Sequence, residues 1–186
     1  SELSDVDIIP SKINNFTRNN SYAVVIGISR YRDEIIHGVK YAESDAQAVA
    51  KYIENIGGVP RQNIKVLTDD KATRSDLEAY IEDWLPKRID KDSKVFIYYA
   101  GHGAPDPENN EAYLVPYDGH PDFKSKLYPL KRMYEALNKL PAEQVVVMLD
   151  SCFSGAGDRS VTKQGARPIS ISIENPVLAG GKLLVL

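Results

Sequence analysis

The chain has 186 residues and a formal net charge of −3, and its acidic and basic side chains are scattered. This length suits one α/β domain with an adequate core, and the charge gives no case for a nucleic-acid-binding surface. No apolar run reaches the roughly 20 residues of a membrane span, and one cysteine excludes an internal disulfide or a zinc cluster. The first residues have no signal-peptide pattern, but Ser1 is not an initiator methionine, so processing could have removed one. We therefore expect a soluble protein and leave its compartment open, cytoplasmic or exported after signal removal.

The chain divides into an arm and a domain. Residues 1–20 are polar and rich in asparagine, which predicts an N-terminal arm laid over the surface. Residues 21–186 are predicted to form one domain. Its first element is a buried strand at residues 22–28, followed by a polar loop at residues 29–40.

A helix, a strand and a second helix come next. From Tyr41 the apolar positions recur at steps of four and three residues, which predicts a helix that stops at residues 57–58, both glycine. Residues 63–68 predict a short strand. Residues 75–78, Ser-Asp-Leu-Glu, fit a capping box at the start of a helix whose apolar face continues to Ile89.

The second half of the domain repeats this alternation. Strands are predicted at residues 94–99 and 145–149, with a helix at residues 130–140 between them. A long connection at residues 104–129 is expected to form a wall of a binding cleft, because such connections in compact domains are usually functional. Residues 182–186 begin a last strand. The alternation predicts an α/β fold with a mostly parallel sheet and helices on both faces.

The only cysteine and one of the three histidines each follow a predicted strand. Cys152 comes after the strand at residues 145–149, and His102 comes after the strand at residues 94–99. If these strands are parallel and adjacent, both side chains emerge at the edge of the sheet where ligands bind. A thiol beside an imidazole predicts nucleophilic catalysis, whereas a lone cysteine is more often an inert apolar residue.

Two motifs carry a resemblance to a known family. Tyr-Ala-Gly-His-Gly at residues 99–103 and Asp-Ser-Cys-Phe-Ser-Gly at residues 150–155 resemble the motifs of caspase-like cysteine peptidases, most closely those of the prokaryotic and metacaspase branches. A histidine about 50 residues before the cysteine is also part of the caspase signature. The resemblance covers roughly residues 21–186. It implies a three-layer α-β-α fold around a mostly parallel sheet.

The resemblance also assigns catalytic roles. Cys152 would be the nucleophile, and His102 would act as general base and then as general acid. The backbone N–H groups of Gly103 and Cys152 would form the oxyanion hole, in which each donor typically stabilises the transition state by about 2.7–4 kcal/mol. The reaction requires no redox or organic cofactor, and we expect no resident metal.

The specificity pocket is expected to be acidic. Asp150 stands where the caspase pattern has glutamine, and residues 44–46 resemble the Asn-Asp-Ala segment in which a metacaspase aspartate helps to form the pocket. If Asp45 and Asp150 share a pocket, they favour a cationic side chain, so we expect cleavage after Arg or Lys. A caspase-type pocket would instead need cations, which Arg30 or Arg32 could supply. The alternatives are that Asp150 caps a turn or holds the loop, and that Asp45 simply stabilises the start of a helix.

Calcium activation is a further expectation, because many metacaspases are activated by calcium. The spacing of the acidic residues in the connecting loops does not match an EF-hand, and solvated loop charges are the alternative. The candidate ligands are Asp106, Glu108, Glu111, Asp118 and Asp158.

Three basic residues follow the expected nucleophile: Arg159, Lys163 and Arg167. Related enzymes are cut in this segment during maturation, so these are candidate self-cleavage sites if the pocket prefers basic residues. Ordinary surface charges are the alternative, since exposed loops are where nicking concentrates.

By the same resemblance, the sheet is expected to be incomplete at its C-terminal edge. A small-subunit fragment that completes it is a candidate partner, and we expect a monomer or weak association.

The sequence thus predicts a cysteine endopeptidase acting on protein or peptide substrates. A non-catalytic interaction domain, an inactive fragment and an Asp-specific protease stay open, whereas a flavodoxin-like domain would need a richer Gly loop after the first strand.

Overall fold

Residues 9–12, 16–106, 111–151 and 181–186 are described by the structure, a computed structural model of the chain. A five-stranded sheet runs through its centre, and all of its strand pairings are parallel. In spatial order the strands are β2 (Ile64–Thr68), β1 (Tyr22–Gly27), β3 (Lys94–Ala100), β7 (Gln144–Asp150) and β8 (Leu183–Val185). The predicted parallel sheet is therefore confirmed.

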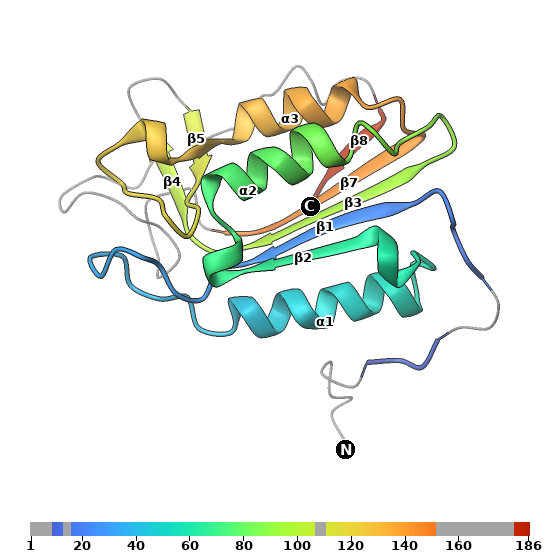
Figure 1. Ribbon diagram of the computed structural model, residues 1–186, viewed down its shortest axis with the longest axis horizontal. Helices are drawn as coiled ribbons and strands as arrows, with labels where there is room; N and C mark the ends of the chain where they lie inside the picture. Colours follow the sequence, from blue (N-terminus) through green and yellow to red (C-terminus); the bar gives the residue numbers. More distant parts are fainter. Residues whose placement is uncertain (1–8, 13–15, 107–110, 152–180) are drawn as a thin grey trace.

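Helices cover both faces of this sheet (Figure 1). Helix α1 (Ala42–Asn55) lies on one face. The other face carries α2 (Arg74–Glu78), which continues into a π-helical turn (Ala79–Trp84), and α3 (Leu130–Lys139). The three-layer arrangement expected from the sequence is confirmed.

The central strands bury side chains on both faces, which is why their sequences are apolar runs without alternation. Along β1, Val24 and Ile26 pack on the side of α2 and α3, whereas Ala23 and Val25 pack on the side of α1. All four are fully buried. The sheet is thus a rigid base whose carboxyl ends can hold reactive groups in fixed positions.

A close contact at Gly27 sets the position of α1. A Cβ atom on this glycine would lie 2.3 Å from the carbonyl oxygen of Ala42 and 2.5 Å from the Cβ of Ala46. Only glycine therefore lets the first turn of α1 press against the end of β1. As a result, the beginning of α1, including Asp45, lies at the carboxyl edge of the sheet.

The connection predicted at residues 104–129 contains regular structure that the prediction missed. A three-stranded antiparallel sheet forms from β4 (Gly103–Asp106), β5 (Glu111–Leu114) and β6 (Tyr128–Pro129). Strands of two to four residues are too short for a periodic pattern, and prolines in β4 and β6 argue locally against strand. Because β4 begins directly after His102, this sheet adjoins the predicted site.

The capping box predicted at residues 75–78 was placed two residues too late. The N-cap is Thr73, whose hydroxyl accepts the backbone N–H of Asp76 at 3.2 Å, while Asp76 accepts the N–H of Thr73 at 3.0 Å. Aspartate closes the box here in place of the usual Glu or Gln. The helix therefore begins at Arg74.

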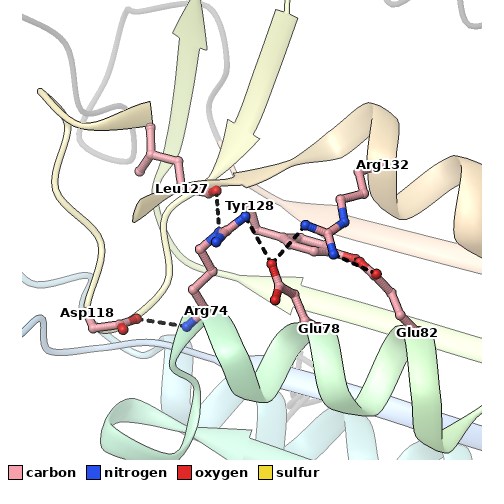
Figure 2. Close-up of polar contacts among 7 residues, drawn as sticks. All are labelled: Arg74, Glu78, Glu82, Asp118, Leu127, Tyr128 and Arg132. Atoms are coloured by element: carbon pink, nitrogen blue, oxygen red, sulfur yellow. Dashed lines mark hydrogen bonds and ion pairs between the residues drawn. The ribbon is translucent and has the colours of Figure 1, made fainter. Parts of the chain in front are cut away.

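Ion pairs fasten α3 to the helical segment beside it (Figure 2). Arg132 of α3 donates to Glu78 at 2.9 Å and to Glu82 at 2.8 Å. Arg74 also pairs with Glu78 at 3.0 Å, and the hydroxyl of Tyr128 donates to Glu82 at 2.8 Å. The residues come from α2, the π-helical turn, β6 and α3, so the network ties the small antiparallel sheet to the main layers.

The described parts of the N-terminal arm lie against the end of α1. The N–H of Arg18 donates to the carbonyl of Gly58 at 2.7 Å, and the Asn55 side chain donates to the carbonyl of Pro10 at 3.0 Å. These contacts are at the far end of α1 from Asp45.

Candidate active site

Strands β3 and β7 are adjacent and parallel, with Ala100 opposite Asp150. In the sequence, His102 follows the end of β3 by two residues and Cys152 follows the end of β7 by two residues. Neighbouring strands of a sheet lie about 4.8 Å apart. Cys152 itself lies outside the described residues. The arrangement of strands on which the prediction depended is nevertheless present, and it directs both segments to the carboxyl edge of the sheet.

The imidazole of His102 is held in one orientation by the backbone. The residue is 2% exposed, and its Nε2 lies 2.6 Å from the carbonyl oxygen of His37. A carbonyl can only accept, so Nε2 carries the hydrogen, and in the neutral ring Nδ1 keeps its lone pair. Nδ1 is buried and has no hydrogen-bond partner among the described residues. This tautomer is the one a general base needs when it accepts a proton at Nδ1.

The sequence did not indicate the partner of His102. The side chain of His37 is exposed, as expected for a loop residue, and only its backbone carbonyl contacts the imidazole. Every residue has such a carbonyl, so residue type carries no signal for this role. The one clue to such a partner is general: a catalytic imidazole commonly needs a group that binds and orients its second ring nitrogen.

The loop that contains His37 is anchored by a buried carboxylate. Asp69 is 5% exposed and accepts the N–H of Ser29 at 2.8 Å, the N–H of Arg30 at 3.0 Å and Nε of Arg30 at 2.9 Å. The hydrogen bond to this carboxylate raises the pKa of the Arg30 guanidinium. Asp69 thus fixes the beginning of the loop at residues 29–40, which reaches across the end of the sheet to His102.

Both cations that could have formed a caspase-type pocket have other contacts. Arg30 is paired with Asp69, and its side chain is 81% exposed. The guanidinium of Arg32 lies 5.7 Å from the ring centroid of Tyr117. These contacts favour neither cation as the floor of a specificity pocket.

The backbone N–H of Gly103 is a hydrogen-bond donor that the pairing of β4 with β5 does not use. The N–H of Val115 donates to the carbonyl of His102 at 3.1 Å, and Gly103 faces Leu114 in the next row. Antiparallel rows alternate between hydrogen-bonded and non-hydrogen-bonded pairs, so the Gly103 row is of the second kind. Its N–H therefore points away from β5 rather than into the ladder.

The two predicted pocket carboxylates share one face of the sheet. Side chains alternate along a strand, and Met148 packs with the α1 side, so Asp150 two residues later faces that side as well. Asp45 lies in the first turn of α1, next to the Ala46 that presses on Gly27. Both carboxylates therefore lie at the carboxyl edge on the α1 side.

Each described calcium candidate has a contact of its own, although Asp106 and Glu111 face each other across β4 and β5. Asp106 pairs with Lys124 at 2.5 Å, Glu111 accepts the Tyr113 hydroxyl at 2.7 Å, and Asp118 accepts the N–H of Arg74 at 2.8 Å. Within the described ranges no group of three or more acidic, histidine or cysteine side chains converges on a metal position. Two other candidates, Glu108 and Asp158, lie outside those ranges.

The three candidate self-cleavage residues, Arg159, Lys163 and Arg167, also lie outside the described residues.

Among the helices that the structure describes, none combines the length and the hydrophobicity needed to cross a membrane.

Comparisons with known proteins give the family and the fold. The family model described as Peptidase_C14, caspase domain, matches residues 20–178, a range that contains both His102 and Cys152. Among solved structures, the chain is similar to a structural-genomics crystal structure of a protein from Geobacter sulfurreducens, with 24% identity and a TM-score of 0.58. The match covers 73% of this chain and 52% of that chain, so this chain spans about half the length of that protein. The search of curated proteins found no match.

Proposed function

The chain belongs to the caspase domain family of C14 peptidases, and on this premise we propose that it is a cysteine endopeptidase that works through Cys152 and His102. The observation that carries the proposal is the orientation of His102. Its Nε2 is occupied by the His37 carbonyl, while the buried Nδ1 has no partner among the described residues. A ring held in this way is prepared to accept a proton at Nδ1 from a nearby thiol.

The proposed reaction has two halves. The sulfur of Cys152 bonds to the substrate carbonyl carbon while its proton passes to Nδ1 of His102, and the N–H of Gly103 stabilises the oxyanion. The carbon–nitrogen bond then breaks, and the imidazolium returns the proton to the leaving amine. In the second half, His102 takes a proton from a water molecule whose oxygen attacks the thioester carbon. The carbon–sulfur bond then breaks and the imidazolium returns the proton to the sulfur, which releases the carboxylic acid and the thiol.

We assign the specificity to Asp45 and Asp150. Their common face at the carboxyl edge supports a pocket with two carboxylates, which favours the guanidinium or ammonium of a substrate Arg or Lys. The contacts of Arg30 with Asp69 and of Arg32 with Tyr117 argue against a pocket for an acidic side chain.

Hydrolysis of paired fluorogenic peptides tests this function. Two peptides identical except for a final Arg or Asp would be compared in the wild-type chain, in Cys152→Ala and in Asp45→Asn. We expect turnover of the Arg peptide alone, its loss in Cys152→Ala, and a higher KM in Asp45→Asn. Preferred turnover of the Asp peptide would overturn the acidic pocket. No turnover of either peptide would favour the non-catalytic alternative.

Two further expectations can be tested with the same assay, each in a separate comparison. Calcium activation is tested by adding calcium ions and then a chelator. A fragment that adds a strand to β8, one of the two edge strands of the described sheet, remains a proposed partner, because a sheet edge is a template for pairing.

A further inference from the structure

Two tyrosines surround the backbone of His102. The N–H of His102 donates to the hydroxyl oxygen of Tyr31 at 2.8 Å. The hydroxyl of Tyr99 donates toward the carbonyl of His102 at 2.7 Å and lies 3.0 Å from the carbonyl of Val115. Both polar groups of the His102 backbone are therefore bound by phenols, and neither bond uses the imidazole.

The two hydroxyl oxygens lie close together, because each is within 3.1 Å of the position that a Cβ atom on Gly101 would take. Burial raises the pKa of Tyr31 and that of Tyr99 well above the usual range for tyrosine, so both hydroxyls keep their hydrogens at neutral pH. The result is that the N–H and the carbonyl of His102 are each bound by a protonated phenol.

The ring of Tyr31 adds a direct contact with the imidazole. Its centroid lies 5.1 Å from that of His102, with an angle of 34° between the two planes. Tyr31 belongs to the same loop as His37, whose carbonyl binds Nε2. One loop thus contacts His102 at its backbone N–H, at its ring face and at its ring nitrogen.

The glycine before His102 makes room for the phenols. A Cβ atom on Gly101 would lie 2.8 Å from the hydroxyl oxygen of Tyr99 and 3.1 Å from that of Tyr31. Any larger residue would displace one or both hydroxyls from the His102 backbone. The glycine in the Tyr-Ala-Gly-His segment is therefore explained by the phenol pair.

We infer that Tyr31, together with Tyr99, is a positioning residue that holds the catalytic base His102 with Nε2 on the His37 carbonyl and Nδ1 available for proton transfer. This inference rests on the proposed function for its effect on turnover. Its effect on the imidazole does not depend on turnover and can be measured in the resting protein.

The test compares Tyr31→Phe with Tyr134→Phe as a matched control. Each variant removes one buried hydroxyl and keeps the ring, but Tyr134 lies on α3, and its hydroxyl has no partner among the described residues. For Tyr31→Phe we expect kcat to fall about ten- to a hundredfold with little change in KM, as for a misplaced catalytic group. Tyr134→Phe keeps the wild-type kcat.

Nitrogen NMR of histidine-labelled protein supplies the second readout, and three histidines give a simple spectrum. The wild-type signal of His102, assigned with His102→Gln, is expected to report the neutral ring with hydrogen on Nε2. In Tyr31→Phe it shifts toward a mixture of tautomers, and Gly101→Ala gives the same shift.

Failure of the inference and failure of the function are distinguishable. If Tyr31→Phe matches Tyr134→Phe in kcat and in the His102 signal, the positioning role is wrong, whether or not the wild type is active. If the wild type is inactive but its His102 signal depends on Tyr31, the positioning role stands and the proposed reaction fails.

Discussion

The ring nitrogen Nε2 of His102 lies 2.6 Å from the backbone carbonyl of His37, a residue 65 positions earlier in the chain. This contact joins the end of β3 to the loop that follows β1. It fixes the tautomer of the only buried histidine in the described part of the chain. The geometry of that loop should therefore control catalysis as directly as the strands do.

A methyl group at Gly38 should disturb this contact. A Cβ atom there would lie 2.7 Å from the carbonyl oxygen of Ser29, which also accepts the N–H of Val39. The backbone next to His37 must then shift, so we expect Gly38→Ala to lower kcat about tenfold or more. Steady-state kinetics check this, with Glu34→Ala as an exposed control in the same loop. Equal kcat values in the two variants would contradict it.

Loss of Asp69 should loosen the loop from its beginning. Asp69→Ala leaves the N–H groups of Ser29 and Arg30 without their acceptor, which should lower the free energy of unfolding by about 1–3 kcal/mol. The Arg30 side chain is mostly exposed, so Arg30→Ala should lower the free energy of unfolding less than Asp69→Ala does. Urea unfolding measures both values, with Asp70→Ala as the exposed neighbouring control. A larger loss in Arg30→Ala than in Asp69→Ala would refute this account of the anchor.

The main sheet was predictable because its strands are buried on both faces. The runs in β1, β3 and β7 are long and apolar, and their order along the chain permits a parallel sheet with few alternatives. The strands β4 and β6 were not predictable, since four and two residues with a proline in each give no periodic signal.

The candidate site, like the fold, was predictable from the sequence only in part. His102 was found by its motif and its place after a strand, and the structure brings Asp45 and Asp150 to one edge of the sheet, although their roles stay predictions. The carbonyl of His37 could not be found from residue type, because its contribution comes from the backbone. Tyr31 was missed because its contact with His102 depends on how the loop folds back, which local sequence does not encode.

Buried tyrosines should limit stability at high pH. Burial raises the pKa of Tyr134 to about 12 and also raises those of Tyr31, Tyr99 and Tyr128, whereas an unfolded tyrosine titrates near pH 10. A group with a raised pKa in the folded state contributes stability below the unfolded pKa and loses it as pH rises toward the folded pKa. The free energy of unfolding should therefore fall above about pH 10, by up to about 1.4 kcal/mol per pH unit for each such tyrosine.

Urea unfolding at a series of alkaline pH values checks this, with ultraviolet absorbance to follow tyrosine ionisation. Tyr134→Phe removes one of the shifted groups, so its stability should decline less steeply between about pH 10 and 12. Identical slopes for this variant and the wild type would show that Tyr134 is not shifted in the folded chain.

The pairing of His102 with the thiol of Cys152 is tested most directly by the pH dependence of alkylation. Iodoacetamide would be added to the wild type and to His102→Gln, and because the chain has one cysteine the label reports Cys152 alone. A thiol without a partner becomes reactive near its ordinary pKa of about 8.5. We expect the wild type to react well below that pH and His102→Gln to react only near it. The same pH profile in both proteins would contradict a Cys152–His102 dyad.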